Sequence, residues 1–242
     1  MTEEQKDPGT AFAEELAKQL PVKAIYKDAG KPAAKQVGQL AQDLVKTIQL
    51  ALAPLQFAGA YQDRLRAFID RSVRAVPEER RVSPPPQILG PIVEGIRYEP
   101  EGTPLDALFS GLLSSSMDAD CVAVAHPAFP SIIRQLSSDE AKILSALKTG
   151  RYLHVYTRAF DHTKNLFVGP IKIELDELPK QDLSYPENVP IYMQHLDKLG
   201  LAGVFQEGNQ EPLVEGGRQT GVRVRSLYRL TEFGALFVKA CT

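Results

Sequence analysis

The chain has 242 residues, a formal net charge of −2 and 43% hydrophobic residues. A chain of this length fits one large or two small domains and can bury a hydrophobic core without disulfide or metal crosslinks. The nearly balanced charge excludes a general basic field that would draw the protein onto nucleic acid, and leaves only local basic patches to consider.

The first residues are acidic and polar, and no apolar signal core follows them. No run of about 18 apolar residues is present, so we expect no transmembrane segment and a cytoplasmic location. The most apolar window is 48–61, from Ile48 to Tyr61. We interpret it as a buried helix, with a membrane-surface amphipathic helix as the alternative.

Helical periodicity dominates the residues up to about 136. The helix predicted over 64–76 has an apolar stripe and a charged face, on which Asp70 and Arg74 are placed to pair. The helix predicted from Pro104 to Met117 begins after Thr103, a favourable N-cap residue. The next long helix opens with a capping box made by Ser137 and Glu140.

After residue 150 the pattern changes to strand-like alternation. We expect strands over 151–160, 166–175, 203–206 and 222–230, helices over 189–199 and 231–240, and a Gly-rich loop over 207–221. Helix, strand, long loop, strand and helix form the outline of a winged helix. The prediction is therefore a mostly α protein, with an N-terminal helical bundle followed by a smaller, winged-helix-like α+β domain. We divide the chain into a polar segment with a short helix (1–20), a helical domain (21–136) and the α+β domain (137–242).

Three arginines on the last predicted strand are the candidate DNA-binding residues. Arg223, Arg225 and Arg229 share one face of the strand, opposite Val222, Val224 and Tyr228. Arginines on a wing strand are suited to contact DNA phosphates. The acidic loop before this strand argues against that use, because Glu207, Glu211 and Glu215 would repel the same phosphates. Protein interaction is therefore the favoured use of the domain, and DNA binding is the alternative.

No motif for catalysis, metal binding or a cofactor emerges. The four histidines and two cysteines lack metal-ligand spacing, and structural roles are expected for His126, His154, His162, His195, Cys121 and Cys241. The glycines at 216–221 lack the ending of a phosphate loop, and the serines at 114–116 have no nucleophile elbow around them. We therefore expect no catalytic residue, no metal and no cofactor, and an enzyme is disfavoured.

Several sequence runs together carry a resemblance to a known family. They are residues 25–38, 52–55, 77–80, 108–118, 126–129, 133–144 and 230–234. With these runs the chain resembles the bacterial Abi-alpha (abortive infection alpha) family. The resemblance implies a role in defence against bacteriophage, and it implies no particular catalytic residue, cofactor or substrate.

Three functional hypotheses follow. The leading one is a cytoplasmic defence protein that acts by interaction with a protein partner, from host or phage, rather than by catalysis. The alternatives are a winged-helix DNA-binding regulator and a membrane-acting effector that uses the helix at 48–61. A homo-oligomer is compatible with all three.

Overall fold

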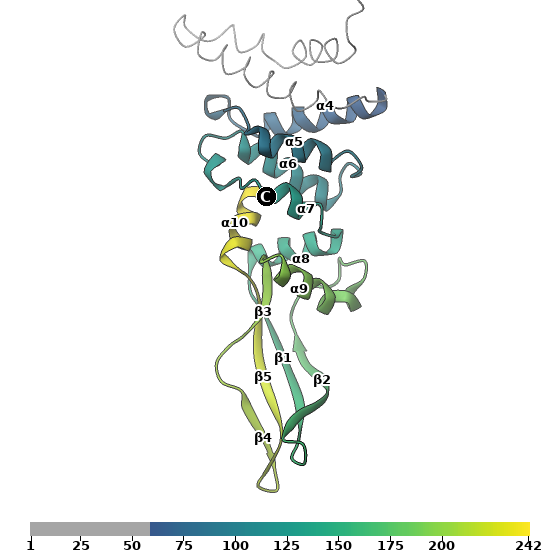
Figure 1. Cartoon of the computed structure of the whole chain (residues 1–242), viewed down its shortest axis with the longest axis vertical. Helices are drawn as coiled ribbons and strands as arrows, with labels where there is room; N and C mark the ends of the chain where they lie inside the picture. The colour runs from purple at the N-terminus through teal and green to yellow at the C-terminus, as the bar shows by residue number, and fades with distance from the viewer. Residues whose placement is uncertain (1–58) are drawn as a thin grey trace, which may run out of the picture. The chain divides into compact units, whose positions relative to one another are not determined.

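The computed structural model describes residues 59–242 (Figure 1). The segment 1–20, the helices predicted between 21 and 58, and most of the 48–61 window lie outside the described residues. The described chain folds as two compact units, residues 59–136 with Lys239–Thr242, and Ser137–Val238. No helix in the described part of the chain is long and apolar enough to cross a membrane.

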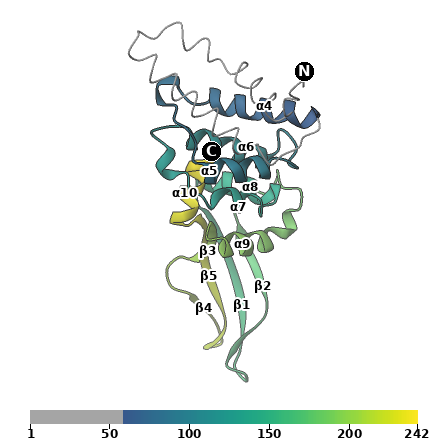
Figure 2. The same cartoon turned by 45° about the horizontal axis from the view of Figure 1, so that its top comes forward.

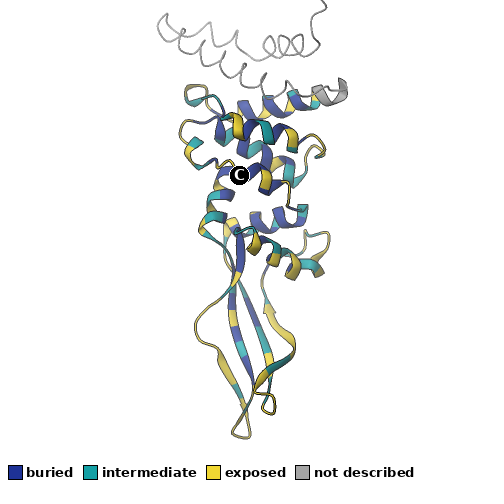
Figure 3. Ribbon diagram, viewed as in Figure 1, coloured by how far each residue is buried: buried dark blue, intermediate teal, exposed yellow. Residues whose placement is uncertain are grey.

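The first unit is helical, as the sequence predicts. Its elements are α4 (Gly59–Arg74), η1 (Glu78–Arg80), α5 (Pro86–Gly95), α6 (Pro104–Ser116), η2 (Val122–Val124) and α7 (Phe129–Ile133). The expected N-cap of α6 is present, since the Asp106 amide donates to Thr103 Oγ1 at 3.1 Å. Asp70 and Arg74 form the predicted ion pair on α4. Leu65, Leu112 and Ile133 are fully buried, and Figure 3 shows in dark blue where buried positions lie along these helices.

Two buried carboxylates of this unit are held by arginines. Asp106, in the first turn of α6, accepts from Arg71 of α4 at 2.9 Å. Asp118 accepts from Arg80 at 2.8 Å, and Asp120 accepts from the same guanidinium at 3.0 Å. These ion pairs connect the start of α6 and the loop after it to other helices. The pairing of Arg71 with Asp106 also gives one of the α4 arginines a structural role that requires no phosphate ligand.

The second unit contains an antiparallel sheet with helices at one end (Figure 1). Its elements are α8 (Ser138–Thr149), β1 (Tyr152–Asp161), β2 (Leu166–Asp176), η3 (Pro186–Asn188), α9 (Val189–Lys198), β3 (Ala202–Gln206), β4 (Glu211–Glu215), β5 (Arg218–Leu230) and most of α10 (Glu232–Cys241), whose last residues belong to the first unit. The strand order is β2-β1-β5-β3, and β4 also pairs with β5. Figure 2 shows β1 and β5 running side by side, in agreement with their register from Tyr152–Tyr228 to Ala159–Gly221.

The Gly-rich stretch before the last strand differs from its prediction as a loop. Glu211–Glu215 forms β4, and β5 begins at Arg218 rather than near 222. Gly216 and Gly217 both have positive φ, 57° and 78°, between the paired residues Glu215 and Arg218. A two-residue hairpin turn with left-handed conformation at both positions favours glycine, so this pair forms a tight turn rather than a flexible loop tip.

The ends of the helices in this unit follow the sequence signals. Ser137 and Glu140 make the predicted capping box at the start of α8. Gly200, with φ of 71°, ends α9, and the Leu201 amide donates to the Leu196 carbonyl at 2.9 Å. Thr231 caps α10 through a 2.8 Å bond from the Gly234 amide. Gly150 ends α8 in an extended conformation rather than the left-handed one, so glycine is not required there.

The carboxylate of Asp139 connects α8 to α9. This side chain is 3% exposed and accepts 2.9 Å hydrogen bonds from the amides of Ser184 and Tyr185. The Tyr192 hydroxyl of α9 donates to it at 3.3 Å, and Lys142 lies at 3.4 Å. Burial alone would raise the pKa of Asp139, but these donors outweigh burial and hold the pKa below its ordinary value.

Replacement of this carboxylate tests the connection. We expect Asp139→Asn to lower the free energy of unfolding by about 2 kcal/mol, because a buried charged acceptor of several hydrogen bonds is lost. The folded-state pKa of Asp139 is below its ordinary value of 3.8. Its stabilising contribution is therefore fully present above about pH 4 and is lost as the pH falls further.

Urea unfolding measured from pH 3 to pH 7 checks both expectations. The variant should lose less stability than the wild type below pH 4. The matched control is Asp182→Asn, which makes the same change at an exposed position. Equal stability of Asp139→Asn and the control would contradict this account.

A close backbone approach at Gly234 provides a second test. A Cβ at this position would overlap the carbonyl oxygen of Leu201, which also accepts the Thr231 amide at 3.0 Å. Gly234→Ala should therefore destabilise the protein by about 1–3 kcal/mol, the usual cost of overpacking.

Gly150→Ala is the control, because its Cβ would meet only Tyr152, at 4.0 Å, and its backbone conformation suits any residue. Thermal unfolding of the two variants should separate them clearly. A melting temperature of Gly234→Ala equal to that of Gly150→Ala would show that the backbone at Leu201 yields freely.

Candidate functional site

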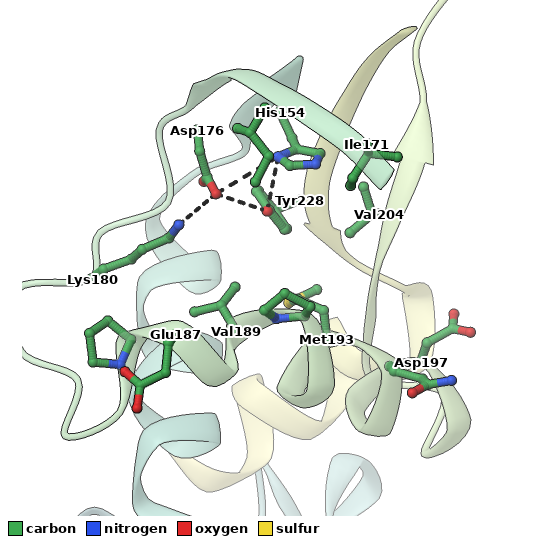
Figure 4. Close-up of a pocket in the computed structure, with 14 residues that line it drawn as sticks. His154, Ile171, Asp176, Lys180, Glu187, Val189, Met193, Asp197, Val204 and Tyr228 are labelled. Atoms are coloured by element: carbon green, nitrogen blue, oxygen red, sulfur yellow. Dashed lines mark hydrogen bonds and ion pairs between the residues drawn. The ribbon is translucent and has the colours of Figure 1, made fainter. Parts of the chain in front are cut away.

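A pocket of about 530 Å³ lies in the second unit, between the sheet and α9. Its walls are mostly apolar, with Ile171 and Ile173 from β2, Val204 from β3, and Val189 and Met193 from α9. Figure 4 shows His154, Tyr228 and Asp176 grouped on one side of the pocket and Val189 and Met193 on the other. A volume in this range with a few convergent polar groups is typical of a ligand site.

Each polar residue of the pocket is placed by a different strand or loop. His154 lies on β1, Tyr228 on β5, Asp176 at the end of β2, and Lys180 in the segment that follows. His154 is directly opposite Asp176 in the β1–β2 register, and Tyr228 is opposite Tyr152, two residues from His154. Neighbouring positions across an antiparallel sheet are within reach of long side chains. The register of three strands therefore creates the cluster.

The four side chains form one hydrogen-bonded network. The Tyr228 hydroxyl lies 3.1 Å from His154 Nδ1 and donates to Asp176 Oδ2 at 3.3 Å. Lys180 Nζ donates to the same carboxylate oxygen at 2.6 Å. Asp176 Oδ1 accepts from the Leu178 amide at 3.2 Å, which turns the chain at the end of β2. The Asp176 carboxylate is thus the centre of the network.

Burial sets the protonation state of the two aromatic members. Burial lowers the pKa of His154, and Lys180 lowers it further against the opposing effect of Asp176, so the imidazole is neutral at pH 7. Burial and the neighbouring Asp176 carboxylate raise the pKa of Tyr228, so its hydroxyl keeps its proton. The network therefore contains one ion pair, Asp176 with Lys180, and two neutral hydrogen-bonding rings.

Only part of this cluster has a signal in the sequence. The alternation of β1 places His154 on one face with Tyr152 and Tyr156, and the alternation of β5 places Tyr228 with Val222 and Val224. A histidine and a tyrosine on otherwise apolar strand faces mark buried polar positions. Asp176 and Lys180 lie in a stretch without periodicity, and their approach to His154 depends on the β1–β2 register.

The three candidate arginines have different surroundings on β5. Arg223 donates to Glu174 at 2.7 Å and to Glu211 at 3.2 Å. The guanidinium of Arg229 lies 3.9 Å from the centre of the Phe205 ring. Arg225 is exposed. The face that they share is the one predicted, and DNA contact by this face stays a prediction.

The remaining sequence candidates have structural contacts. His126 Nδ1 accepts from the Ala128 amide at 3.1 Å, and His195 Nδ1 lies 2.6 Å from Glu140. Cys241 is buried, as expected, and burial raises the pKa of its thiol, whereas Cys121 is only half-buried. Within residues 59–242, no group of three or more His, Cys, Asp or Glu side chains is arranged to hold a metal ion.

The fold is a set of helices followed by a five-stranded antiparallel sheet with a pocket against α9. The abortive infection alpha family matches the chain over residues 59–241. The chain therefore belongs to this family, as its sequence runs indicated. The searches of curated proteins and of solved structures gave no significant match.

Removal of one hydroxyl tests the network. Tyr228→Phe deletes the group that joins His154 to Asp176 and leaves the imidazole Nδ1, in a residue that is 7% exposed, without its partner. We expect a loss of about 1–3 kcal/mol in the free energy of unfolding.

Tyr156→Phe is the matched control. It removes a tyrosine hydroxyl from the face of β1 that bears His154, and it leaves every hydrogen bond of the network in place. Its effect should stay within about 0.5 kcal/mol. Urea unfolding at pH 7 compares the two variants, and equal losses would mean that the Tyr228 hydroxyl does not join the network.

Proposed function

We propose that the protein acts in defence against bacteriophage by binding a protein partner, and that the partner binds at strand β2. Membership of the abortive infection alpha family supports the defence role. The observation that carries the binding role is a set of exposed aliphatic side chains on β2, with Ile171 and Ile173 facing the pocket and Leu166 and Leu175 outside it. Leu166, Ile171, Ile173 and Leu175 are between 42% and 61% exposed.

The position of β2 at the edge of the sheet supports this use of its exposed side chains. It is the outer strand in the order β2-β1-β5-β3, so its outer edge has no neighbouring strand in the described sheet. A free edge offers backbone donors and acceptors to an added strand, and aliphatic side chains beside it provide apolar contact area. Contiguous exposed apolar side chains on a soluble domain commonly mark an interaction site.

The finer description of the second unit as a winged helix is part of the proposal. It is supported by α9 followed by β3, the β4 hairpin and β5, with β1 on the other side of β5. The strands of the β1–β2 hairpin agree with the runs predicted at 151–160 and 166–175, whereas β4 lies within the predicted loop. In this proposal the hairpin is the partner-binding element, and the domain does not read bases.

Fewer observations support the two alternative functions, DNA binding and action on a membrane. A DNA-binding regulator needs cations free to meet phosphates, and the guanidinium of Arg223 is already neutralised by two carboxylates. Arg225 and the Arg229 side chain stacked on Phe205 leave this alternative open. A membrane-acting effector depends on the 48–61 window, most of which lies outside the described residues. A cytoplasmic location and homo-oligomer formation remain parts of the proposal.

A double variant of β2 tests the proposal. Leu166→Lys with Leu175→Lys places two charges on the exposed side chains of β2 that do not line the pocket. We expect the variant to fold and to lose at least about tenfold in plaque protection, because a buried interface disfavours unpaired charge. Plaque counts on a susceptible host that expresses each variant measure the effect.

Val214→Lys is the control, since Val214 is 59% exposed on β4 and the change likewise replaces an exposed aliphatic side chain with lysine, at one position instead of two. Affinity purification before and during infection should recover a protein partner with the wild type and with the control, but not with the β2 variant. Recovery of DNA that washes off with salt would instead favour the regulator. Full protection by the β2 variant would contradict the proposed surface.

A further inference from the structure

The pocket between the sheet and α9 contains a hydrogen-bond acceptor that no described protein group uses. His154 is 7% exposed and lines the pocket. Its Nδ1 belongs to the network with Tyr228, whereas Nε2 has no hydrogen bond to any of the residues from 59 to 242. A polar atom of a nearly buried side chain that faces a cavity without a partner costs free energy unless a ligand or water satisfies it.

The network determines what Nε2 offers to a ligand. The Tyr228 hydroxyl has one proton, and we place it towards the Asp176 carboxylate because a carboxylate only accepts and a charge-assisted hydrogen bond is the stronger one. Towards His154 the same hydroxyl therefore accepts, and Nδ1 carries the hydrogen of the neutral imidazole. Nε2 is then left with a lone pair, so the pocket presents an acceptor and selects a ligand that donates.

The charges around the pocket favour a cationic donor. Lys180 is the only lysine or arginine among the described residues of the lining, and its ammonium is bound to Asp176 at 2.6 Å. Two further acidic residues of the lining, Glu187 and Asp197, are exposed on the side of η3 and α9. Beyond the internal ion pair, the lining thus carries two negative charges. Figure 4 shows these two carboxylates towards opposite ends of the pocket.

The walls between the charged groups are apolar. Ile171, Ile173 and Val204 face Val189 and Met193 across the cavity, whose volume of about 530 Å³ accommodates a body of ten or more heavy atoms. Apolar walls contribute binding free energy in proportion to the ligand surface that they bury. A ligand with a charged head alone would leave these walls in contact with water.

We propose that this pocket binds an ammonium group carried on an apolar body, with an N–H donated to His154 Nε2 and the positive charge favoured by the net negative charge that Glu187 and Asp197 give the lining. The site shares Ile171 and Ile173 with the exposed side chains of β2, but the polar groups proposed to select its ligand, His154, Glu187 and Asp197, lie outside β2. The ammonium comes either from a free amphipathic amine or from a lysine side chain flanked by apolar residues.

Three probes with one body test the proposal on the full chain. They are 4-phenylbutylammonium, 4-phenylbutanoate and 4-phenylbutanol, compared by isothermal titration at pH 7.5. We expect saturable binding of the ammonium probe with a Kd on the order of 1 mM or tighter. The carboxylate probe should bind at least about tenfold more weakly than the ammonium probe. The alcohol probe, a neutral donor, should bind with intermediate affinity, and the imidazole resonances of His154 should shift with both donor probes.

A double variant at two exposed acidic residues tests whether they favour a cationic ligand. Glu187→Gln with Asp197→Asn changes two exposed residues and should weaken the ammonium probe by about three- to tenfold. The control, Asp182→Asn with Glu215→Gln, removes the same charge outside the pocket and should leave binding unchanged. A short Leu-Lys-Leu peptide, compared with its Nζ-acetylated form, distinguishes a lysine source from a free amine.

The proposal is overturned by any of three results. One is the absence of saturable ammonium binding. The second is equal or tighter binding of the carboxylate probe. The third is ammonium binding that leaves the His154 resonances unchanged. Because these measurements use purified protein and no phage, their outcome is separate from the plaque protection that tests the β2 surface.

Discussion

The Asp139 carboxylate is the interaction on which the second unit depends most. It lies in the first turn of α8, where the helix dipole favours an acid, and it accepts from two loop amides and from Tyr192 on α9. The neighbouring Glu140 bonds to His195, also on α9. Two consecutive acidic residues at one helix start therefore set the position of α9. Since α9 forms one wall of the pocket, the geometry of the candidate site depends on this pair.

The pocket and the exposed strand use the same sheet in different ways. The side chains of Ile171 and Ile173 on β2 line the pocket. The outer backbone edge of β2 pairs with no other strand of the described sheet. A ligand in the pocket would contact side chains of the strand that a partner would extend. Occupancy of the pocket and pairing at the edge would then affect one another through the position of β2, and linkage would require the effect to be reciprocal.

The sequence predicted most local structure and little of the site. Caps such as Thr103, Ser137 and Thr231 act within one helical turn, so their patterns are readable directly. The alternation of β5 correctly separated Arg223 and Arg225 from Val222 and Val224. The pocket was missed because His154, Asp176 and Tyr228 meet only through strand register, which local patterns do not specify. The β4 strand was missed because Gly216 and Gly217 were interpreted as a flexible tip instead of a tight turn.

The order of strands has a consequence for how the chain folds during synthesis. The β1–β2 hairpin is local and is able to form early, but β1 also requires β5, which is synthesised more than fifty residues after β2 begins. Until β5 emerges, the inner edge of β1 lacks its hydrogen-bonding partner. Pairing over such a separation is slow and leaves apolar surface open to other chains. The addition of β5 is thus the step that completes the sheet. It ends the period in which unpaired strand edges favour aggregation.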